Sequence, residues 1–415
     1  MLISTEMGGP TYSSFVGALV ISCLAGLCLS NNININDPNP ITLISDGLTN
    51  FQSTSFSIMD HILDHLSFTS FIRSPPIEAI YQFGDSISDT GNYAHDQPLS
   101  NFNQFPYGET YFHRPAGRCS DGLLMVDYFA KFLKLPLLDA YLNKDGNFTH
   151  GVNFAVTGAS ALNDTRLVSK YNVVSTTTNH SLSVQLGWFK SHLNSICSNA
   201  SECKKELAKG LFLMGEIGGN DYNFVFFQGK PISIAYQMVP EVVDAIRAAI
   251  KEIINLGATR IVVPGNFPVG CMTVFLAIFK SNDATMYDDH KCLKYLNKFA
   301  KYHNNQLQKA IRGLEKDYPN ATIVYADYYT AFTEALQHPP YHGFERSVIH
   351  RACCGEGDNE YNFNFGRLCG NKGVPACENP QHHISWDGIH LTQHAYRVMA
   401  NWLMRNILYG LTHVS

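Results

Sequence analysis

What this sequence lacks already excludes several classes of protein. Its 30 Lys and Arg and 35 Asp and Glu give a formal charge of −5, and no basic stripe is present that could neutralise a phosphate backbone. We therefore expect no nucleic-acid partner. No continuous apolar run reaches the roughly 20 residues that a membrane-spanning helix needs, so we expect no stable membrane insertion. No internal repeat or proline-rich linker divides residues 77–415, which are expected to form a single domain.

Common catalytic and metal-binding signatures are also missing. No Gly-x-Ser-x-Gly sequence occurs, which excludes the nucleophile elbow of the common α/β-hydrolases. Neither His-Glu-x-x-His nor a paired Cys-x-x-Cys pattern is present. One metal alternative remains, in which nitrogen and oxygen ligands come from His382, His383, Asp387 and His390. Adjacent histidines seldom converge on one ion, so we favour an interpretation that requires no metal or organic cofactor.

The N-terminus contains one continuous apolar stretch, Phe15–Leu29, whose length is typical of the core of a signal peptide. The segment before it contains Glu6 and no Lys or Arg, which is atypical of a signal peptide, and a buried N-terminal helix is the alternative. We assign residues 1–30 to a signal peptide. Residues 31–76 are polar and rich in Asn and Ser, and we interpret them as a loose extension.

The number and spacing of the cysteines that follow the predicted signal peptide also indicate an exported protein. Nine remain, and their spacing favours local disulfides over a metal site. The expected bridges join Cys197 to Cys203 and Cys271 to Cys292. Two further bridges are expected within one group, and spacing does not decide their connectivity. This group comprises Cys353, Cys354, Cys369 and Cys377. Cys119 is then left as the free cysteine.

Short apolar segments alternate with amphipathic helices from residue 77 onward, and a chain with 45% hydrophobic residues can bury a large core. The expected strands are residues 77–83, 211–217, 260–265 and 321–327. The expected helices are residues 239–256, 293–314 and 392–408. This alternation predicts an α/β fold in which helices cover both faces of a mainly parallel sheet.

The sequence FGDSISDTGN, from Phe83 to Asn92, places Ser86 directly after the first expected strand. Ligands bind beyond the carboxyl ends of the strands in such sheets, so a substrate could reach Ser86 there. A serine hydroxyl needs a general base before it can act as a nucleophile. Asp387 and His390, three residues apart in SWDGIHLT, could provide one. In a turn or helix, the carboxylate would hold one imidazole nitrogen while the other faces Ser86.

This chemistry also requires hydrogen-bond donors for the negative charge that develops on an attacked carbonyl oxygen. Three donors could form such an oxyanion hole: the N–H groups of Ser86 and Gly158 and the side chain of Asn220. Each residue could also have no catalytic role. Asn220 follows two glycines and could belong to a simple turn, and His390 is one of 17 histidines and could be a surface residue. Their joint placement favours a serine hydrolase.

Four motifs occur in the order and positions expected of the GDSL esterase/lipase family, the SGNH hydrolases, and resemble especially its plant branch. They are FGDSISDTGN, GVNFAVTGA, GGNDYNF and SWDGIHLT. The resemblance runs from about Ile77 to the C-terminal helix and implies a three-layer α/β/α, flavodoxin-like fold. It makes Ser86 the nucleophile, Asp387 and His390 its catalytic partners, and Gly158 and Asn220 oxyanion donors. Ile87 stands where leucine is commoner, a change between side chains of similar volume.

Three other segments look most like the plant subgroup that contains sinapine esterase and acetylajmalan esterase. They are PYGETYFHRPAGRCSDGLLMVDYFA, PGNFPVGC and CCGEGDNEYNFNFGRLCG. The resemblance implies a carboxylic ester hydrolase that forms an acyl-serine intermediate on a small ester, such as the acetate of an alkaloid. One alternative is an acyltransferase that passes the same acyl group to an alcohol or sugar. Another is a non-catalytic glycoprotein binding module.

The expected compartment is the secretory route, ending in the extracellular space, the apoplast or the vacuole. Five Asn-x-Ser/Thr sequons indicate a glycosylated surface. These sequons begin at Asn147, Asn163, Asn179, Asn199 and Asn320. The expected partner is a small-molecule ester substrate, and we expect the chain to act as a monomer.

Overall fold

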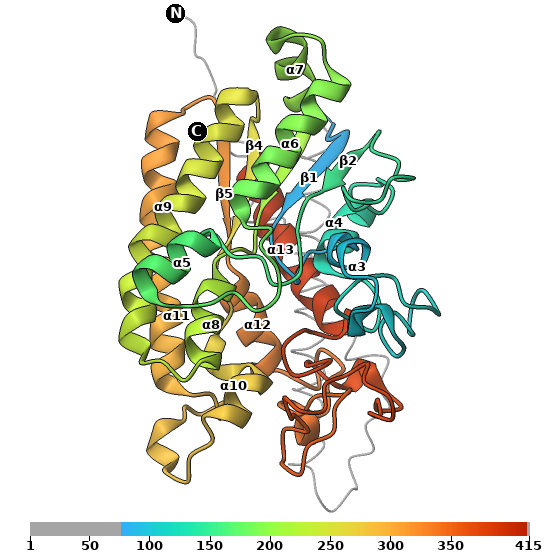
Figure 1. Cartoon of the computed structure of the whole chain (residues 1–415), viewed down its shortest axis with the longest axis vertical. Coiled ribbons are helices and arrows are strands. Elements are labelled where there is room, and N and C mark those ends of the chain that lie inside the picture. The colour runs from blue at the N-terminus through green and yellow to red at the C-terminus, as the bar shows by residue number, and fades with distance from the viewer. Residues whose placement is uncertain (1–75, 413–415) are drawn as a thin grey trace, which may run out of the picture. The chain divides into compact units, whose positions relative to one another are not determined.

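The computed structural model describes residues 76–412 of the chain (Figure 1). The predicted signal peptide at residues 1–30 and the predicted extension at residues 31–76 lie outside the described residues, apart from Pro76. Among residues 76–412, no helix has both the length and the apolar character needed to cross a membrane.

Five parallel strands form the central sheet in the order β2-β1-β3-β4-β5. Four of them overlap the predicted segments: β1 (Ala79–Phe83), β3 (Gly210–Met214), β4 (Arg260–Pro264) and β5 (Thr322–Ala326). The edge strand β2 (Gly151–Asn153) was not predicted. Its three residues are too few to produce a recognisable apolar run, and pairing with β1 defines it.

Alternate residues of the strands face opposite sides of the sheet, so each strand contributes to two separate cores. On one side, Tyr81, Phe83 and Phe212 belong to a large aromatic and aliphatic cluster. The long helices that pack against this cluster are α6 (Leu182–Ile196), α9 (Ile232–Leu256) and α11 (Lys294–Asp317).

On the other side of the sheet, Ile80, Leu211 and Val262 belong to a second cluster. The helices that cover it are α4 (Met125–Phe132), α12 (Tyr328–Gln337) and α13 (Gln393–Thr412). Figure 1 shows the two helical layers on opposite faces of the sheet. The predicted three-layer α/β/α, flavodoxin-like architecture with a parallel sheet is therefore confirmed.

The three predicted helices correspond to α9, α11 and α13, and α9 begins earlier than predicted because it continues through Pro240. Hydrophobic spacing did not reveal α6, whose inner face includes the buried polar side chains of Gln185 and His192. The remaining helices are α3 (Asn92–Asp96), α5 (Asp164–Tyr171), α7 (Ala200–Leu207), α8 (Gly219–Phe227) and α10 (Thr273–Ile278). Short 3₁₀ turns lie at Asn101–Asn103, Val269–Cys271, Ala284–Met286, Arg346–Val348 and Pro380–His382.

Four disulfides cross-link the described part of the chain. The predicted Cys197–Cys203 and Cys271–Cys292 bridges are confirmed. The undecided group of four forms the bridges Cys353–Cys377 and Cys354–Cys369. Cys119 is free among the described residues and is buried. The adjacent pair of bridges therefore closes two overlapping loops shortly before the Asp387 segment.

We expect the double substitution Cys354→Ser/Cys369→Ser to lower the free energy of unfolding by about 3 kcal/mol, because it opens a loop of about 15 residues in the unfolded chain. Urea unfolding measures this difference. The control is Cys197→Ser/Cys203→Ser, which opens a loop of six residues and should cost less. An unchanged unfolding midpoint in the first variant would contradict the prediction.

Candidate active site

The loops that follow the parallel strands bring the predicted residues to one edge of the sheet. Ser86 follows β1, Gly158 follows β2, and Asn220 lies in the first turn of α8, which follows β3. The carboxyl ends of parallel strands meet at a common edge, which is where such sheets bind ligands. The topology therefore places these three residues at one edge of the sheet.

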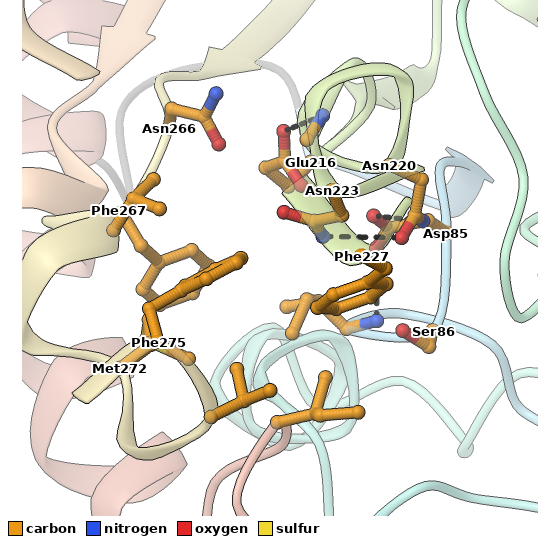
Figure 2. A pocket seen from close by; sticks show the side chains of 15 residues that line it. Asp85, Ser86, Glu216, Asn220, Asn223, Phe227, Asn266, Phe267, Met272 and Phe275 are labelled. Atoms are coloured by element: carbon orange, nitrogen blue, oxygen red, sulfur yellow. Dashed lines mark hydrogen bonds between the residues drawn. The ribbon is translucent and has the colours of Figure 1, made fainter. Parts of the chain in front are cut away.

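A cavity of about 490 Å³, its open mouth included, lies at this edge (Figure 2). Ser86 and Asn220 line it, and so does Ile389, the neighbour of His390. Within residues 76–412, neither the hydroxyl nor the N–H of Ser86 forms a hydrogen bond. The serine is thus available to a molecule in the cavity, although it is only 7% exposed.

The turn that carries Ser86 is held on both sides. On one side, the side-chain amide of Gln185 accepts from the N–H of Gly84 at 2.9 Å and donates to its carbonyl at 2.8 Å. On the other side, the N–H of Asp85 donates to the carbonyl of Glu216 at 3.0 Å. A Cβ at Gly84 would lie 2.9 Å from the carbonyl oxygen of Glu216. The Ser86 turn can therefore lie this close to the loop after β3 only because residue 84 is glycine.

Gly158 also lies in a position that requires glycine. Its φ is +80°, and a Cβ there would lie 2.4 Å from Cβ of Thr177. Its N–H has no acceptor within the described residues, as an oxyanion donor requires. The preceding residue, Thr157, donates its N–H and its hydroxyl to Asp89 at 2.8 and 3.0 Å. Sequence reasoning missed Asp89, which ties the Gly158 loop to the Ser86 motif.

The side-chain amide of Asn220 already forms two hydrogen bonds within the protein. Its side-chain nitrogen donates to a carboxylate oxygen of Asp85 and to the carbonyl of Ala159, each at 3.0 Å. These two bonds join the loops after β1, β2 and β3. Both amide hydrogens are used, so Asn220 could stabilise an oxyanion only by sharing or releasing one of these bonds.

Asp85 and Glu216 form a buried carboxyl pair beside Ser86. Burial raises the pKa of Asp85 to about 6. Burial and the charge of Asp85 hold the pKa of Glu216 well above its ordinary value of 4.5. Glu216 is therefore the protonated partner and donates to Asp85, while its other oxygen accepts from the N–H of Gly219 at 3.1 Å. Sequence reasoning missed Glu216, whose position in GEIGGND offers no signal of its own.

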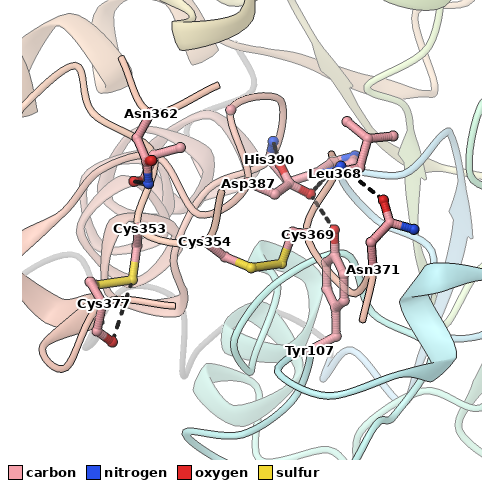
Figure 3. The surroundings of a disulfide bond; sticks show 12 residues. Tyr107, Cys353, Cys354, Asn362, Leu368, Cys369, Asn371, Cys377, Asp387 and His390 are labelled. Atoms are coloured by element: carbon pink, nitrogen blue, oxygen red, sulfur yellow. Dashed lines mark hydrogen bonds and ion pairs between the residues drawn. A yellow bond between two sulfur atoms is a disulfide. The ribbon is translucent and has the colours of Figure 1, made fainter. Parts of the chain in front are cut away.

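Asp387 and His390 form the predicted pair (Figure 3). They lie in a turn before α13, with Nδ1 of His390 2.6 Å from Oδ2 of Asp387. The buried hydroxyl of Tyr107 donates to the same oxygen at 2.8 Å, and the N–H groups of Ile389 and His390 donate to Oδ1. Burial alone would raise the pKa of Asp387, but His390 and these hydrogen bonds lower it below its ordinary value.

The second ring nitrogen of His390 forms no hydrogen bond within residues 76–412. His390 lies close enough to the Ser86 turn for its charge to oppose the burial that raises the pKa of Asp85. The ring of Phe102 contacts His390 edge-on, with centroids 5.8 Å apart. The proton transfer between Ser86 and His390 stays a prediction, because no direct hydrogen bond joins them here.

The side chains of the zinc alternative do not form one cluster in the described part of the chain. The potential metal-ligating group there is instead Cys353, Cys377 and His383. Its two sulfur atoms are joined in a disulfide (Figure 3). A disulfide cannot supply the thiolate ligands that zinc binds.

A three-layer α/β/α fold with this serine, glycine, asparagine and Asp–His pair around its parallel strand ends defines the class of SGNH hydrolases. The chain belongs to the GDSL-like Lipase/Acylhydrolase family, whose sequence profile matches residues 80–403. It is therefore a carboxylic ester hydrolase by family, and named esterases are among its relatives.

Three relatives illustrate this similarity. A GDSL esterase/lipase of Arabidopsis thaliana is 45% identical over 335 residues, which cover 79% of this chain and 82% of the relative. Acetylajmalan esterase of Rauvolfia serpentina is 43% identical over 81% of this chain and 87% of its own length. Sinapine esterase of Brassica napus is 44% identical over 79% of this chain and 85% of its own length.

The Asp85–Glu216 pair leads to a prediction about pH. Glu216 binds its proton more tightly in the folded than in the unfolded protein, so its stabilising contribution is lost as the pH rises above 4.5. Glu216→Gln keeps a donor toward Asp85 and cannot ionise. We therefore expect the free energy of unfolding of this variant, relative to wild type, to increase between about pH 5 and 8.

Urea unfolding at several pH values tests this expectation. Glu315→Gln, on the exposed side of α11, is the matched control and should show no comparable trend. A difference between Glu216→Gln and wild type that stays constant with pH would show that Glu216 does not hold the proton.

Proposed function

We propose that the chain hydrolyses a small ester through an acyl-serine intermediate formed on Ser86. His390 removes the proton of the Ser86 hydroxyl as the serine attacks the carbonyl carbon, and later returns a proton to the departing alkoxide. Asp387 orients the imidazole and stabilises its cationic form. Water, activated by His390, then releases the acid and regenerates Ser86.

The hydrogen bonding of Asp387 is the observation that carries this proposal. Four donors surround its carboxylate and keep it ionised, and one of them is Nδ1 of His390. This arrangement assigns the acceptor lone pair of neutral His390 to the other ring nitrogen, where a general base needs it.

The oxyanion donors in this proposal are the N–H groups of Ser86 and Gly158 together with Asn220. Support comes from the two backbone N–H groups, which have no acceptor within residues 76–412. Each well-placed donor contributes roughly 3 kcal/mol to transition-state stabilisation in comparable sites. No metal or organic cofactor has a role in these steps.

The substrate that we propose is a small specialised-metabolite ester, with acetylated alkaloids within this class. The names of two relatives, acetylajmalan esterase and sinapine esterase, support it. We propose water as the acceptor, in preference to an alcohol or sugar, because these relatives are named as esterases.

We further propose that residues 77–415 form one hydrolase domain that is exported, glycosylated and monomeric, and that resides in the apoplast or vacuole. The four disulfides favour an oxidising compartment. All five sequon asparagines are exposed, as glycosylation requires. These are Asn147, Asn163, Asn179, Asn199 and Asn320.

Ser86→Ala should reduce the hydrolysis of a short para-nitrophenyl ester by a factor of about 10⁴ or more, since it removes the nucleophile. It should also abolish covalent labelling by a fluorophosphonate probe. The matched control is Ser88→Ala in the same motif, which should retain both activities. Turnover of the Ser86→Ala variant at the wild-type rate would reject the proposed mechanism, provided that its unfolding midpoint is unchanged.

A further inference from the structure

The side chain of Tyr107 contacts the catalytic pair from a distant part of the chain. Its hydroxyl donates to Oδ2 of Asp387 at 2.8 Å, although the two residues are 280 positions apart. Tyr107 is buried, with only 2% of its surface exposed. The other three hydrogen bonds to this carboxylate come from Ile389 and His390, in the same turn as Asp387. Tyr107 thus ties the carboxylate to another part of the fold, which the local turn cannot do.

The ring of Tyr107 is held by its neighbours, so its hydroxyl has a fixed direction. It packs in a small buried cluster with Trp386 and the Cys354–Cys369 bridge (Figure 3). Its ring centroid lies 6.1 Å from that of Trp386 and 5.2 Å from that of Phe102, and both rings are edge-on to it. The phenol therefore cannot turn away from the carboxylate without disturbing this cluster.

The hydroxyl of Tyr107 shares one carboxylate oxygen with the imidazole. Burial, together with the charge of Asp387, holds the pKa of Tyr107 well above its ordinary value, so the phenol remains a donor. Oδ2 of Asp387 also receives Nδ1 of His390, at 2.6 Å. A hydrogen bond to an ionised oxygen draws negative charge toward the donor. The phenol therefore weakens the attraction that this oxygen exerts on a protonated imidazole.

This attraction matters because a general base works only while it is unprotonated. A carboxylate with its full charge on Oδ2 would stabilise the imidazolium more strongly. His390 would then stay protonated, and inactive as a base, up to a higher pH. Sharing the oxygen with the phenol reduces this effect while the carboxylate remains directed at Nδ1.

Other ionisable groups also lie near the pair. Burial raises the pKa of Asp85, in the turn after β1, to about 6, and the charge of the imidazole opposes that rise. Burial also raises the pKa values of the Cys119 thiol and of the Tyr396 phenol in α13, both of which interact with Asp387. None of these three forms a hydrogen bond with Tyr107 within residues 76–412. They are the same in wild type and in a Tyr107 variant, so the difference between the two proteins reports on the Tyr107 bond.

We propose that Tyr107 is a positioning residue of the esterase: its hydroxyl fixes the Asp387 carboxylate and limits the proton affinity of His390, which extends activity to more acidic pH. This role rests on the proposed esterase function and deepens it. The alternative is that the hydrogen bond only satisfies a buried phenol. The pH profile separates the two, because a bond of that kind would not move it.

Tyr107→Phe removes the hydroxyl and keeps the ring. The test measures kcat/KM of the full-length protein for para-nitrophenyl acetate across the pH range. We expect the acidic limb of the profile to move up by about one pH unit, so the ratio of variant to wild-type kcat/KM should fall about tenfold from the alkaline plateau to the acidic limb. The rate of Ser86 labelling by a fluorophosphonate, which needs the same base, should show the same shift. A limb that coincides with that of wild type, or moves to lower pH, would overturn the proposal.

The matched control is Tyr222→Phe, which removes another buried phenol hydroxyl, 2.8 Å from Nδ1 of His303. Neither of these residues forms a hydrogen bond with the catalytic pair within the described part of the chain, so the acidic limb should stay in place. An equal shift in this control would mean that the loss of any buried phenol moves the profile, and the proposal would be rejected.

Replacement of Tyr107 by 3-fluorotyrosine decides the question if Tyr107→Phe does not fold, because it keeps both the ring and the hydroxyl. Fluorine makes the phenol a stronger hydrogen-bond donor. The acidic limb should therefore move in the opposite direction, to lower pH. An unchanged limb, or one displaced to higher pH, would count against the role assigned to Tyr107.

Failure of the esterase function gives a different result. A wild-type protein that hydrolyses para-nitrophenyl acetate, with a limb that does not respond to changes at Tyr107, retains its proposed function and loses only the positioning role. A wild-type protein that does not hydrolyse this ester, and whose Ser86 is not labelled by a fluorophosphonate, loses both.

Discussion

Buried carboxyl groups hold together the loops at the carboxyl edge of the sheet. Asp89 binds the loop that carries Gly158, and Asp221 of α8 accepts from the N–H groups of Ala161 and Leu162 at 2.8 and 3.0 Å. Asp85 joins the Ser86 turn to Asn220. Burial raises the pKa of Asp221 to about 7 and also raises that of Asp89. The cost of burying these groups is offset by the hydrogen bonds that position the loops.

The neighbours of each carboxyl group decide its protonation. Asp387 lies beside His390 and accepts four hydrogen bonds, so its pKa is lowered even though it is buried. Glu216 lies beside another carboxyl group, so its pKa is raised and it retains a proton. Two buried acids on the same edge can therefore act differently, one as an anion that orients an imidazole and one as a neutral donor that supports Asp85.

The sequence predicted the parts of the fold that depend on local pattern. Four strands were evident because their apolar runs are continuous, whereas β2 depends on its pairing with β1. Ser86, Asn220 and the Asp387–His390 pair were found because they lie in short motifs. Tyr107 and Glu216 were not, since their importance comes from contacts with residues distant in the chain. The contact between Ser86 and His390 remains predicted, and no local pattern could establish it.

Cys353 and Cys354 connect the turn before α13 to a loop that two disulfides close. Their N–H groups donate to the carbonyls of Ser385 and Trp386, at 3.1 and 2.7 Å, immediately before Asp387. Both cysteines are also bridged to the loop that follows them. The support for the imidazole-bearing turn is thus completed by oxidation. Both bridges therefore help to fix the position of the turn that carries Asp387 and His390, and reducing them would remove part of its support.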